Sequence, residues 1–274
     1  MDKKIHVLAL VLLLLMIGCG PSEESPENKV LNNGSLESVK RAGVLRWGAD
    51  VVGGVPYVFE DPKAPGSYIG FEVDIADAIA KHLGVQQKLV IGPWDNLIPD
   101  LQKGNFDLAM NGIEGTEERG KLVLFSEPYF VYAQQITVRQ ETQGINRLED
   151  LKGKKVATLS GTAAEDILRG IAGIQVQINP EIIYSYQDLE DGKVDAVVLD
   201  SPIAAAYGAP NPKLKNVGGT FGEGIYVIVF RQDQIALRDA VNSALRGMKE
   251  SGKFRAIYQK WGIMDSRQAS IGIR

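Results

Sequence analysis

The residues of this chain that could do chemistry are carboxylates and one arginine that stand where predicted strands and helices begin or end. Asp50 follows the strand predicted over residues 44–49, and Asp200 follows the apolar run 196–199. Arg119 comes just after a sequence that is typical of a helix start. A carboxylate at a strand end is a natural partner for an ammonium group, whereas the planar fork of an arginine suits a carboxylate. These residue types therefore indicate the binding of small charged groups.

Each of these residues also has a purely structural interpretation, which the sequence leaves open. Arg119 can pair on the surface with Glu117 or Glu118, an interaction that contributes little to stability. Asp200 can cap the helix that is predicted to begin at Pro202.

A second helix start offers free backbone amides. Thr162-Ala163-Ala164-Glu165 is a capping box that directly follows Gly161. The amides of such a helix start could hold a carboxylate from the opposite side of a cleft, and the cap stabilises the helix in either case.

The elements that must position these residues alternate between strand and helix. Apolar residues at 73, 76, 79, 80 and 83 have the spacing of a helix that Gly84 would stop. The predicted strands cover 44–49, 88–91, 106–111, 155–159, 194–199 and 225–230, and the predicted helices cover 73–83, 95–103, a segment from 162, 202–207 and 237–248. Such alternation favours an α/β fold with parallel sheets that are covered on both faces.

One internal repeat indicates two lobes built on the same plan. The pattern Leu-x-x-Gly-x-x-Asp, followed by three apolar residues, starts at Leu101 and again 88 residues later at Leu189. A generic junction between a helix and a strand also explains this match. Ligands of open α/β sheets lie beyond the carboxyl ends of the strands, so two facing lobes would share one cleft.

The composition excludes several other classes of protein. The 274 residues are 45% hydrophobic and 23% charged, which is ordinary for a globular protein. Lys and Arg number 30 against 34 Asp and Glu, so no basic excess favours nucleic acid. Two histidines and one cysteine argue against a zinc site, a Cys/His dyad or a disulfide framework. We therefore expect no metal, no cofactor and no nucleic-acid partner.

The first 34 residues have the pattern of a targeting segment followed by a tether. Residues 1–19 contain two lysines, an apolar run and a glycine before Cys19, which resembles a bacterial lipoprotein cleavage box. This pattern predicts a lipoprotein signal peptide with lipid attached to Cys19. An uncleaved anchor, or a plain signal peptide with a buried Cys19, is the alternative. Residues 20–34 are rich in Pro, Ser, Glu and Asn and predict a flexible tether.

Four segments match one protein family, in the order that the family has them. They are Gly70-Phe71-Glu72-Val73-Asp74-Ile75, Trp94-Asp95-Asn96-Leu97-Ile98-Pro99, Asp107-x5-Ile113-x2-Thr116-x2-Arg119 with Phe125-Ser126-x-Pro128-Tyr129, and Gly161-Thr162 followed by Asp195-x4-Asp200. In these segments the chain resembles the extracellular solute-binding proteins, family 3, of bacterial polar amino-acid ABC transporters. The resemblance covers residues 36–262.

The resemblance implies a two-lobed, periplasmic-binding-protein-like α/β fold. Each lobe would be a mainly parallel sheet flanked by helices, and two hinge strands, near residues 133–136 and 226–228, would join the lobes. The first lobe would be discontinuous, with residues 35–134 plus 228–274, and the second would hold residues 135–227.

The resemblance also implies roles for individual residues. Arg119 and the amides after Gly161 would hold the α-carboxylate of an amino acid, and Asp200 would take its α-amino group. Trp94 would cover the ligand side chain, unless it only packs against Leu97. The full predicted ligand-binding set is Asp50, Trp94, Asn111, Gly112, Glu114, Arg119, Gly161, Thr162, Ala163 and Asp200.

Two departures from the family bear on specificity. Relatives often have Ser or Thr where this chain has Glu114, whose carboxylate could reach the ligand or accept a hydrogen bond within its own lobe. Ala163-Ala164 stands where some relatives have hydroxyl or amide side chains. Asp50, which matches a position of the side-chain pocket, and Asp200 add two further acids. With Arg119 the pocket has a charge of −2, which favours basic or neutral polar amino acids.

The resemblance finally implies a monomeric binding protein and not an enzyme. It would bind an amino acid with high affinity, close about its hinge and deliver the ligand to an ABC transporter permease. Lipid on Cys19 would hold it at the membrane, in the periplasm or at the cell surface. The alternative is a cyclohexadienyl dehydratase, acting on prephenate or arogenate on the same fold, for which Glu114 is the one candidate general acid.

Overall fold

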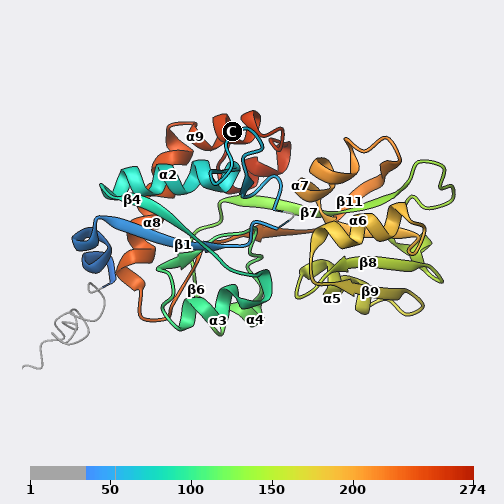
Figure 1. Cartoon of the computed structure of the whole chain (residues 1–274), viewed down its shortest axis with the longest axis horizontal. Coiled ribbons are helices and arrows are strands. Elements are labelled where there is room, and N and C mark those ends of the chain that lie inside the picture. Colours follow the sequence, from blue (N-terminus) through green and yellow to red (C-terminus); the bar gives the residue numbers. More distant parts are fainter. Residues whose placement is uncertain (1–34, 53) are drawn as a thin grey trace, which may run out of the picture.

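Two β-sheets with helices packed on their faces form the two lobes of the computed structural model (Figure 1). The structure describes residues 35–52 and 54–274. The predicted signal peptide, Cys19 and the predicted tether therefore lie outside the described residues. Within the described ranges, every helix is too short or too polar to cross a membrane.

The first sheet has the strand order β4-β1-β5-β12-β6. Its strands are β1 (Val44–Ala49), β4 (Gln86–Ile91), β5 (Leu108–Ala109), β6 (Leu124–Phe125) and β12 (Val229–Phe230). Its helices are residues 35–42, α2 (Phe71–Leu83), η1 (Trp94–Asn96), α3 (Leu97–Gln102), α4 (Glu117–Gly120), α8 (Ile235–Glu250) and α9 (Lys253–Lys260). The last element, η4 (Ser266–Ile271), contacts β7 (Phe130–Arg139). A short hairpin of β2 (Phe59–Glu60) and β3 (Tyr68–Ile69) precedes α2.

The amphipathic pattern of the sequence explains how α2 packs in this lobe. Phe71, Ile75 and Ile79 are fully buried and recur every four residues, so they lie on one face of the helix. The helix ends at Gly84, which adopts the left-handed conformation with φ 73°. The stop signal predicted from the sequence is therefore confirmed.

The second sheet has the strand order β11-β7-β10-β8-β9. Its strands are β7 (Phe130–Arg139), β8 (Lys155–Leu159), β9 (Gln175–Asn179), β10 (Ala196–Asp200) and β11 (Leu214–Tyr226). Its helices are η2 (Leu148–Leu151), α5 (Ala163–Arg169), α6 (Ile182–Glu190), α7 (Ser201–Ile203) and η3 (Ala204–Gly208).

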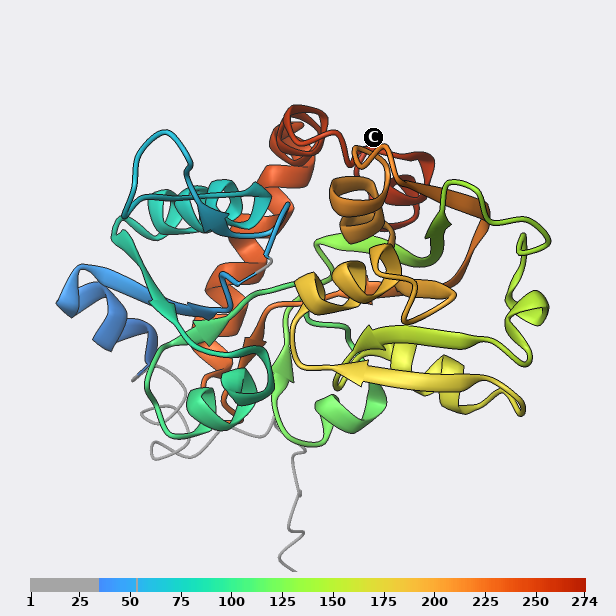
Figure 2. The same cartoon turned by 45° about the vertical axis from the view of Figure 1, so that its right-hand side comes forward.

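Two long strands, β7 and β11, pass between the lobes (Figure 1). They pair antiparallel from Leu214 opposite Arg139 to Tyr226 opposite Phe130. The chain then enters β12 of the first sheet, so α8 and α9 pack beside α2 although they lie far from it in the sequence (Figures 1 and 2). The division at residues 134, 135, 227 and 228 stays a prediction.

The predicted two-lobed α/β fold with sheets flanked by helices is confirmed, except that both sheets are mixed rather than mainly parallel. Among the described residues, each sheet has two parallel and two antiparallel pairings. The strands of the helix-connected units run parallel, as the alternation predicts. The strands that cross between the lobes, and β12, return in the opposite direction and make the antiparallel pairs.

The internal repeat corresponds to the same junction in both lobes. The Asp107 carboxylate accepts a hydrogen bond of 2.9 Å from the amide of Arg46 at the start of β1. The Asp195 carboxylate accepts an equal bond of 2.9 Å from the amide of Lys155 at the start of β8. In each lobe the aspartate thus ties two parallel neighbouring strands together where they begin.

Candidate functional site

A cavity lies between the two lobes, at the ends of strands from both sheets. We call it the interlobe cavity. It is lined by seven of the ten predicted site residues, namely Asp50, Trp94, Asn111, Gly112, Glu114, Thr162 and Asp200. Arg119 and Gly161 line a neighbouring pocket together with Trp94. Other lining residues were missed by the sequence analysis: Val52, Gly54, Tyr57, Leu159, Glu181, Ile182, Leu199 and Ile203.

Asp50 connects three loops of the first lobe beside this cavity. Its carboxylate accepts hydrogen bonds from the amide of Val52 at 2.7 Å and from the amide of Trp94 at 3.0 Å. Its own amide donates to the Asn111 side chain at 3.0 Å. Burial raises the pKa of Asp50, and the two backbone bonds oppose that shift. Asp50 therefore lines the cavity and also fixes the surrounding loops.

Glu114 and Arg119 form an ion pair that reaches across to the second lobe. One carboxylate oxygen of Glu114 pairs with Nη1 of Arg119, and the other accepts a hydrogen bond of 3.0 Å from the amide of Ala163. Nη2 of Arg119 donates to the carbonyl oxygen of Gly161 at 2.8 Å. We call the Glu114–Arg119 pair, together with its contacts to Ala163 and Gly161 of the second lobe, the interlobe clamp. Glu114 is only 2% exposed, so the clamp holds a desolvated carboxylate.

The lobes also meet at Trp94 and Asp95. The indole Nε1 of Trp94 donates to the carbonyl oxygen of Ser160 at 2.9 Å, and the Ser160 hydroxyl donates to Asp95 at 3.0 Å. The guanidinium carbon of Arg119 lies 5.4 Å from the centre of the Trp94 ring, close enough for a cation–π contact. These contacts hold the two lobes together around the interlobe cavity.

Asp200 is the last residue of β10, and its buried side chain lines the cavity. Its carboxylate accepts hydrogen bonds from Nε2 of Gln134 at 2.7 Å and from the hydroxyl of Tyr226, whose oxygen lies 2.7 Å from that of Tyr57. Burial first, and the negative charge of Glu114 second, raise the pKa of Asp200 to about 8. The Asp200 side chain makes no cap for α7, so the helix-cap interpretation of this residue is wrong.

Glu72, which belongs to the family segment that begins at Gly70 but is not among the predicted site residues, supports the loop that lines the site. Its carboxylate accepts hydrogen bonds from the amide of Gly112 at 2.7 Å and from the hydroxyl of Tyr129 at 2.5 Å. Burial raises the pKa of Glu72 to about 7. Gly112 has φ 62°, and a Cβ there would lie 2.7 Å from the ring of Tyr57. Only glycine fits this turn toward the cavity.

The helix start at α5 is capped as predicted, with one difference. The Thr162 hydroxyl accepts a hydrogen bond of 3.4 Å from the amide of Glu165. The Glu165 carboxylate reaches back to the amide of Gly161, at 2.8 Å, rather than to that of Thr162. The amide of Ala163 is left for Glu114 of the other lobe.

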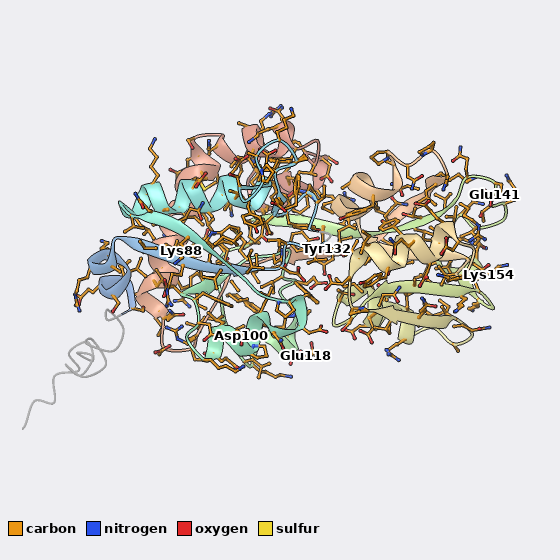
Figure 3. The ribbon with its side chains drawn as sticks, in the orientation of Figure 1. Lys88, Asp100, Glu118, Tyr132, Glu141 and Lys154 are labelled. Carbon is orange, nitrogen blue, oxygen red and sulfur yellow. The ribbon has the colours of Figure 1, made fainter. Side chains whose placement is uncertain are left out.

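The interlobe cavity is strongly acidic. Asp50, Glu114, Glu181 and Asp200 line it, and no lysine, arginine or histidine is among its described lining residues. Burial raises the pKa of Glu181, and the charges of Asp50 and Asp95 raise it further. Tyr132, which Figure 3 shows between the two lobes, also has a raised pKa because of burial and the negative charge of Glu114. Such a cavity can hold a positively charged group.

These acids are not arranged to hold a metal ion. Within residues 35–52 and 54–274, no group of three or more His, Cys, Asp or Glu side chains has a suitable geometry.

We expect the stability of the ligand-free protein to fall as the pH rises from about 4 to about 8. The folded protein keeps protons on Glu72 and Asp200, whose pKa values are about 7 and about 8. The unfolded chain releases them near pH 4. Between the unfolded pKa near 4 and the folded pKa values, the folded state therefore binds more protons than the unfolded state. The free energy of unfolding is greatest at the acidic end of this range. The extra stability is lost once the pH has passed the folded pKa values.

Urea unfolding curves at several pH values measure this slope. The Asp200→Asn variant should show a smaller fall than the wild type, because asparagine does not titrate. A stability that increases over the same range would contradict the assignment of these protons.

Comparison with known proteins agrees with this geometry. The family model for bacterial extracellular solute-binding proteins, family 3, matches residues 49–264. The chain is 33% identical to the L-cystine-binding protein TcyJ of Escherichia coli (strain K12), over 84% of this chain and 86% of that protein.

Two solved structures of amino-acid-binding proteins are similar in sequence and fold. An ancestral arginine-binding protein bound to arginine is 40% identical, with a TM-score of 0.75 over 80% of this chain and 98% of that one. The ancestral amino acid-binding protein AncCDT-1, a precursor of cyclohexadienyl dehydratase, is 35% identical, with a TM-score of 0.77 over 83% of this chain and 99% of that one. From the family match and the two-lobed fold together, we conclude that this chain belongs to the bacterial extracellular solute-binding proteins, family 3.

Proposed function

We propose that this protein binds a cationic amino acid between its two lobes and delivers it to the permease of an ABC transporter. The observation that carries the proposal is the interlobe cavity, with four carboxylates and no basic side chain among its described lining residues. A positively charged ligand lowers the cost of ionising buried carboxylates such as Asp200, whereas an acidic ligand raises it.

In this proposal the charged side chains of the site and the amide of Ala163 have separate roles. Asp200 takes the α-ammonium group, and Asp50 and Glu181 face the positive end of the side chain. The guanidinium of Arg119 and the amide of Ala163 receive the α-carboxylate when Glu114 moves aside. The arginine bound by the ancestral relative is a ligand of this class.

Closure of the lobes and delivery belong to the same proposal. The two strands that cross between the lobes provide a hinge, and contacts such as Trp94 to Ser160 join the lobes over the cavity. Attachment to the membrane through Cys19 and a monomeric state are further parts of the proposal, the first of which rests on the sequence of residues 1–19.

The dehydratase alternative is less well supported by the site. It needs a general acid that keeps a proton near the leaving hydroxyl. Both carboxylate oxygens of Glu114 are engaged within the protein, one with Arg119 and one with the amide of Ala163. This geometry supports binding rather than catalysis.

A thermal-shift screen of the purified protein with the twenty amino acids tests the proposal. A ligand that binds only the folded protein stabilises it, by about 2.7 kcal/mol at a hundredfold excess over Kd. The melting temperature therefore rises. We expect arginine, lysine or histidine to raise it most, and glutamate and aspartate not to raise it. Turnover of prephenate in the same preparation would instead establish the enzyme.

A further inference from the structure

The carboxylate of Glu114 accepts hydrogen bonds from Arg119 and from the amide of Ala163. These are the two donors that, in the proposed function, bind the carboxylate of the ligand. We propose that Glu114 is a specificity-determining residue that replaces this carboxylate, so that the cleft binds amines and guanidines without a carboxylate at least as tightly as the corresponding amino acids. The inference rests on the proposed function in one respect, which is that the interlobe cavity binds an organic cation.

The hydrogen bonds of the interlobe clamp leave little of Arg119 for another anion. Nη1 of Arg119 donates both to the carboxylate of Glu114 and, at 2.9 Å, to the carbonyl oxygen of the same residue. Nη2 donates to the carbonyl oxygen of Gly161 across the cleft. The amide of Ala163 is also used, by the second oxygen of Glu114. The carboxylate of Glu114 therefore already binds a hydrogen-bond donor from each lobe, Arg119 from the first and the amide of Ala163 from the second.

The backbone of Glu114 is fixed at the hinge, so this placement is built into the fold. Glu114 pairs with Tyr226 in an isolated antiparallel bridge. On either side of it, the amide of Gly115 donates to the carbonyl oxygen of Ile225 at 2.9 Å, and the amide of Val227 donates to that of Ile113 at 2.9 Å. Glu114 can therefore move away from Arg119 by rotation of its side chain and not by a shift of its backbone.

A ligand with an α-carboxylate must displace Glu114, and the displaced carboxylate then loses Arg119, its only cationic partner among residues 35–52 and 54–274. Glu114 is 2% exposed, and its negative charge already raises the pKa of the buried Asp200. An unpaired carboxylate in such a site is costly. The gain from pairing the ligand carboxylate with Arg119 is therefore offset by the loss of the same pair with Glu114.

A cation without a carboxylate avoids this exchange. It leaves the Glu114–Arg119 pair intact and places its positive charge against the remaining acids of the interlobe cavity, Asp50, Glu181 and Asp200. The affinity of the site then comes from the cationic end of the ligand.

Calorimetric titration with two matched pairs of compounds tests the inference. The probes are arginine with its decarboxylated form agmatine, and lysine with its decarboxylated form cadaverine. The wild type is compared with Glu114→Ser and with Glu114→Gln, which keeps the shape of the side chain. Glu118→Gln is the matched control, because Glu118 is exposed on α4, at the edge of the first lobe in Figure 3, and loses the same charge.

In the wild type and in Glu118→Gln, we expect each amine to bind at least as tightly as its parent amino acid. In both Glu114 variants the ratio of affinities should shift toward the amino acid by about tenfold or more, since Arg119 becomes free to pair with the ligand carboxylate. Melting temperatures of all variants confirm that they are folded.

Two results would overturn the inference in different ways. If the wild type binds arginine and lysine more than about tenfold tighter than their amines, Glu114 does not replace the ligand carboxylate, and the proposed function stands. If none of the four compounds binds the wild type or any variant, the cavity is no cation site, and the proposed function fails together with the inference.

Discussion

Replacing Asp200 by asparagine is expected to weaken the binding of arginine or lysine by about a hundredfold, or ~2.7 kcal/mol. Asp200 is buried at the end of β10, and its pKa of about 8 shows how costly its charge is without a cationic partner. A bound ammonium group would relieve that cost and gain a charge-assisted hydrogen bond. Asparagine keeps the size of the side chain and can still accept from Gln134, so the fold should be retained.

The matched control is Asp195→Asn, at the opposite end of the same chain segment. Its carboxylate accepts a hydrogen bond from the amide of Lys155 and does not line the interlobe cavity. This variant should bind with wild-type affinity in calorimetry. Equal losses in both variants would mean that β10 is merely distorted and that Asp200 makes no contact with the cation.

Replacing Arg119 by alanine is expected to open the ligand-free protein and to weaken the binding of amino acids and amines alike by about a hundredfold or more. Without the guanidinium, closure would bury the carboxylate of Glu114 unpaired, and breaking such a pair costs about 3–5 kcal/mol. The other described contacts across this part of the cleft are few, at Trp94, Asp95 and Ser160. Opening lets water reach Glu114, so the open state becomes favoured.

Small-angle X-ray scattering measures this change as a larger radius of gyration in the ligand-free Arg119→Ala protein than in the wild type. Arg246→Ala is the control, because Arg246 pairs with Glu127 on the outer surface and is half exposed. It should scatter like the wild type. Identical curves for Arg119→Ala and the wild type, with unchanged affinity, would show that the interlobe clamp does not hold the lobes together.

Local sequence signals predicted the elements that lie next to the site. Strands β1 and β8 have the bounds that the apolar runs indicate, and α5 begins after Thr162 as its capping box requires. Each of these signals acts within a few residues of the chain, through side-chain alternation or a cap, so it can be found without knowing the tertiary structure.

Other elements could not be predicted, because their signals depend on distant partners. Strand β9 (Gln175–Asn179) is an exception, because its residues alternate polar and apolar throughout, so it carried a local signal that was missed; in the structure it pairs with β8. The long strands β7 and β11 are defined by pairing with each other over a separation of about 80 residues. The mixed direction of both sheets follows from these crossings, which no local pattern reveals.

The same limit applies to the site. The sequence left open whether Glu114 contacts a ligand or stays in its own lobe, and neither alternative describes its hydrogen bond to the amide of Ala163, 49 residues away in the other lobe. Glu72 and Glu181 were missed because an acid on a helix or in a loop is usually solvated. A glutamate on the buried face of α2, beside Phe71, was the one signal that could have identified Glu72.

The most direct test of the central claim is a calorimetric titration of the purified wild-type protein with arginine, lysine and glutamate under one set of conditions. We predict one molecule of arginine or lysine bound per chain, with a Kd of about 1 μM or below, and no detectable binding of glutamate. Preferential binding of glutamate, or no binding of either basic amino acid, would contradict the claim that the acidic cavity between the lobes is a site for a cationic amino acid.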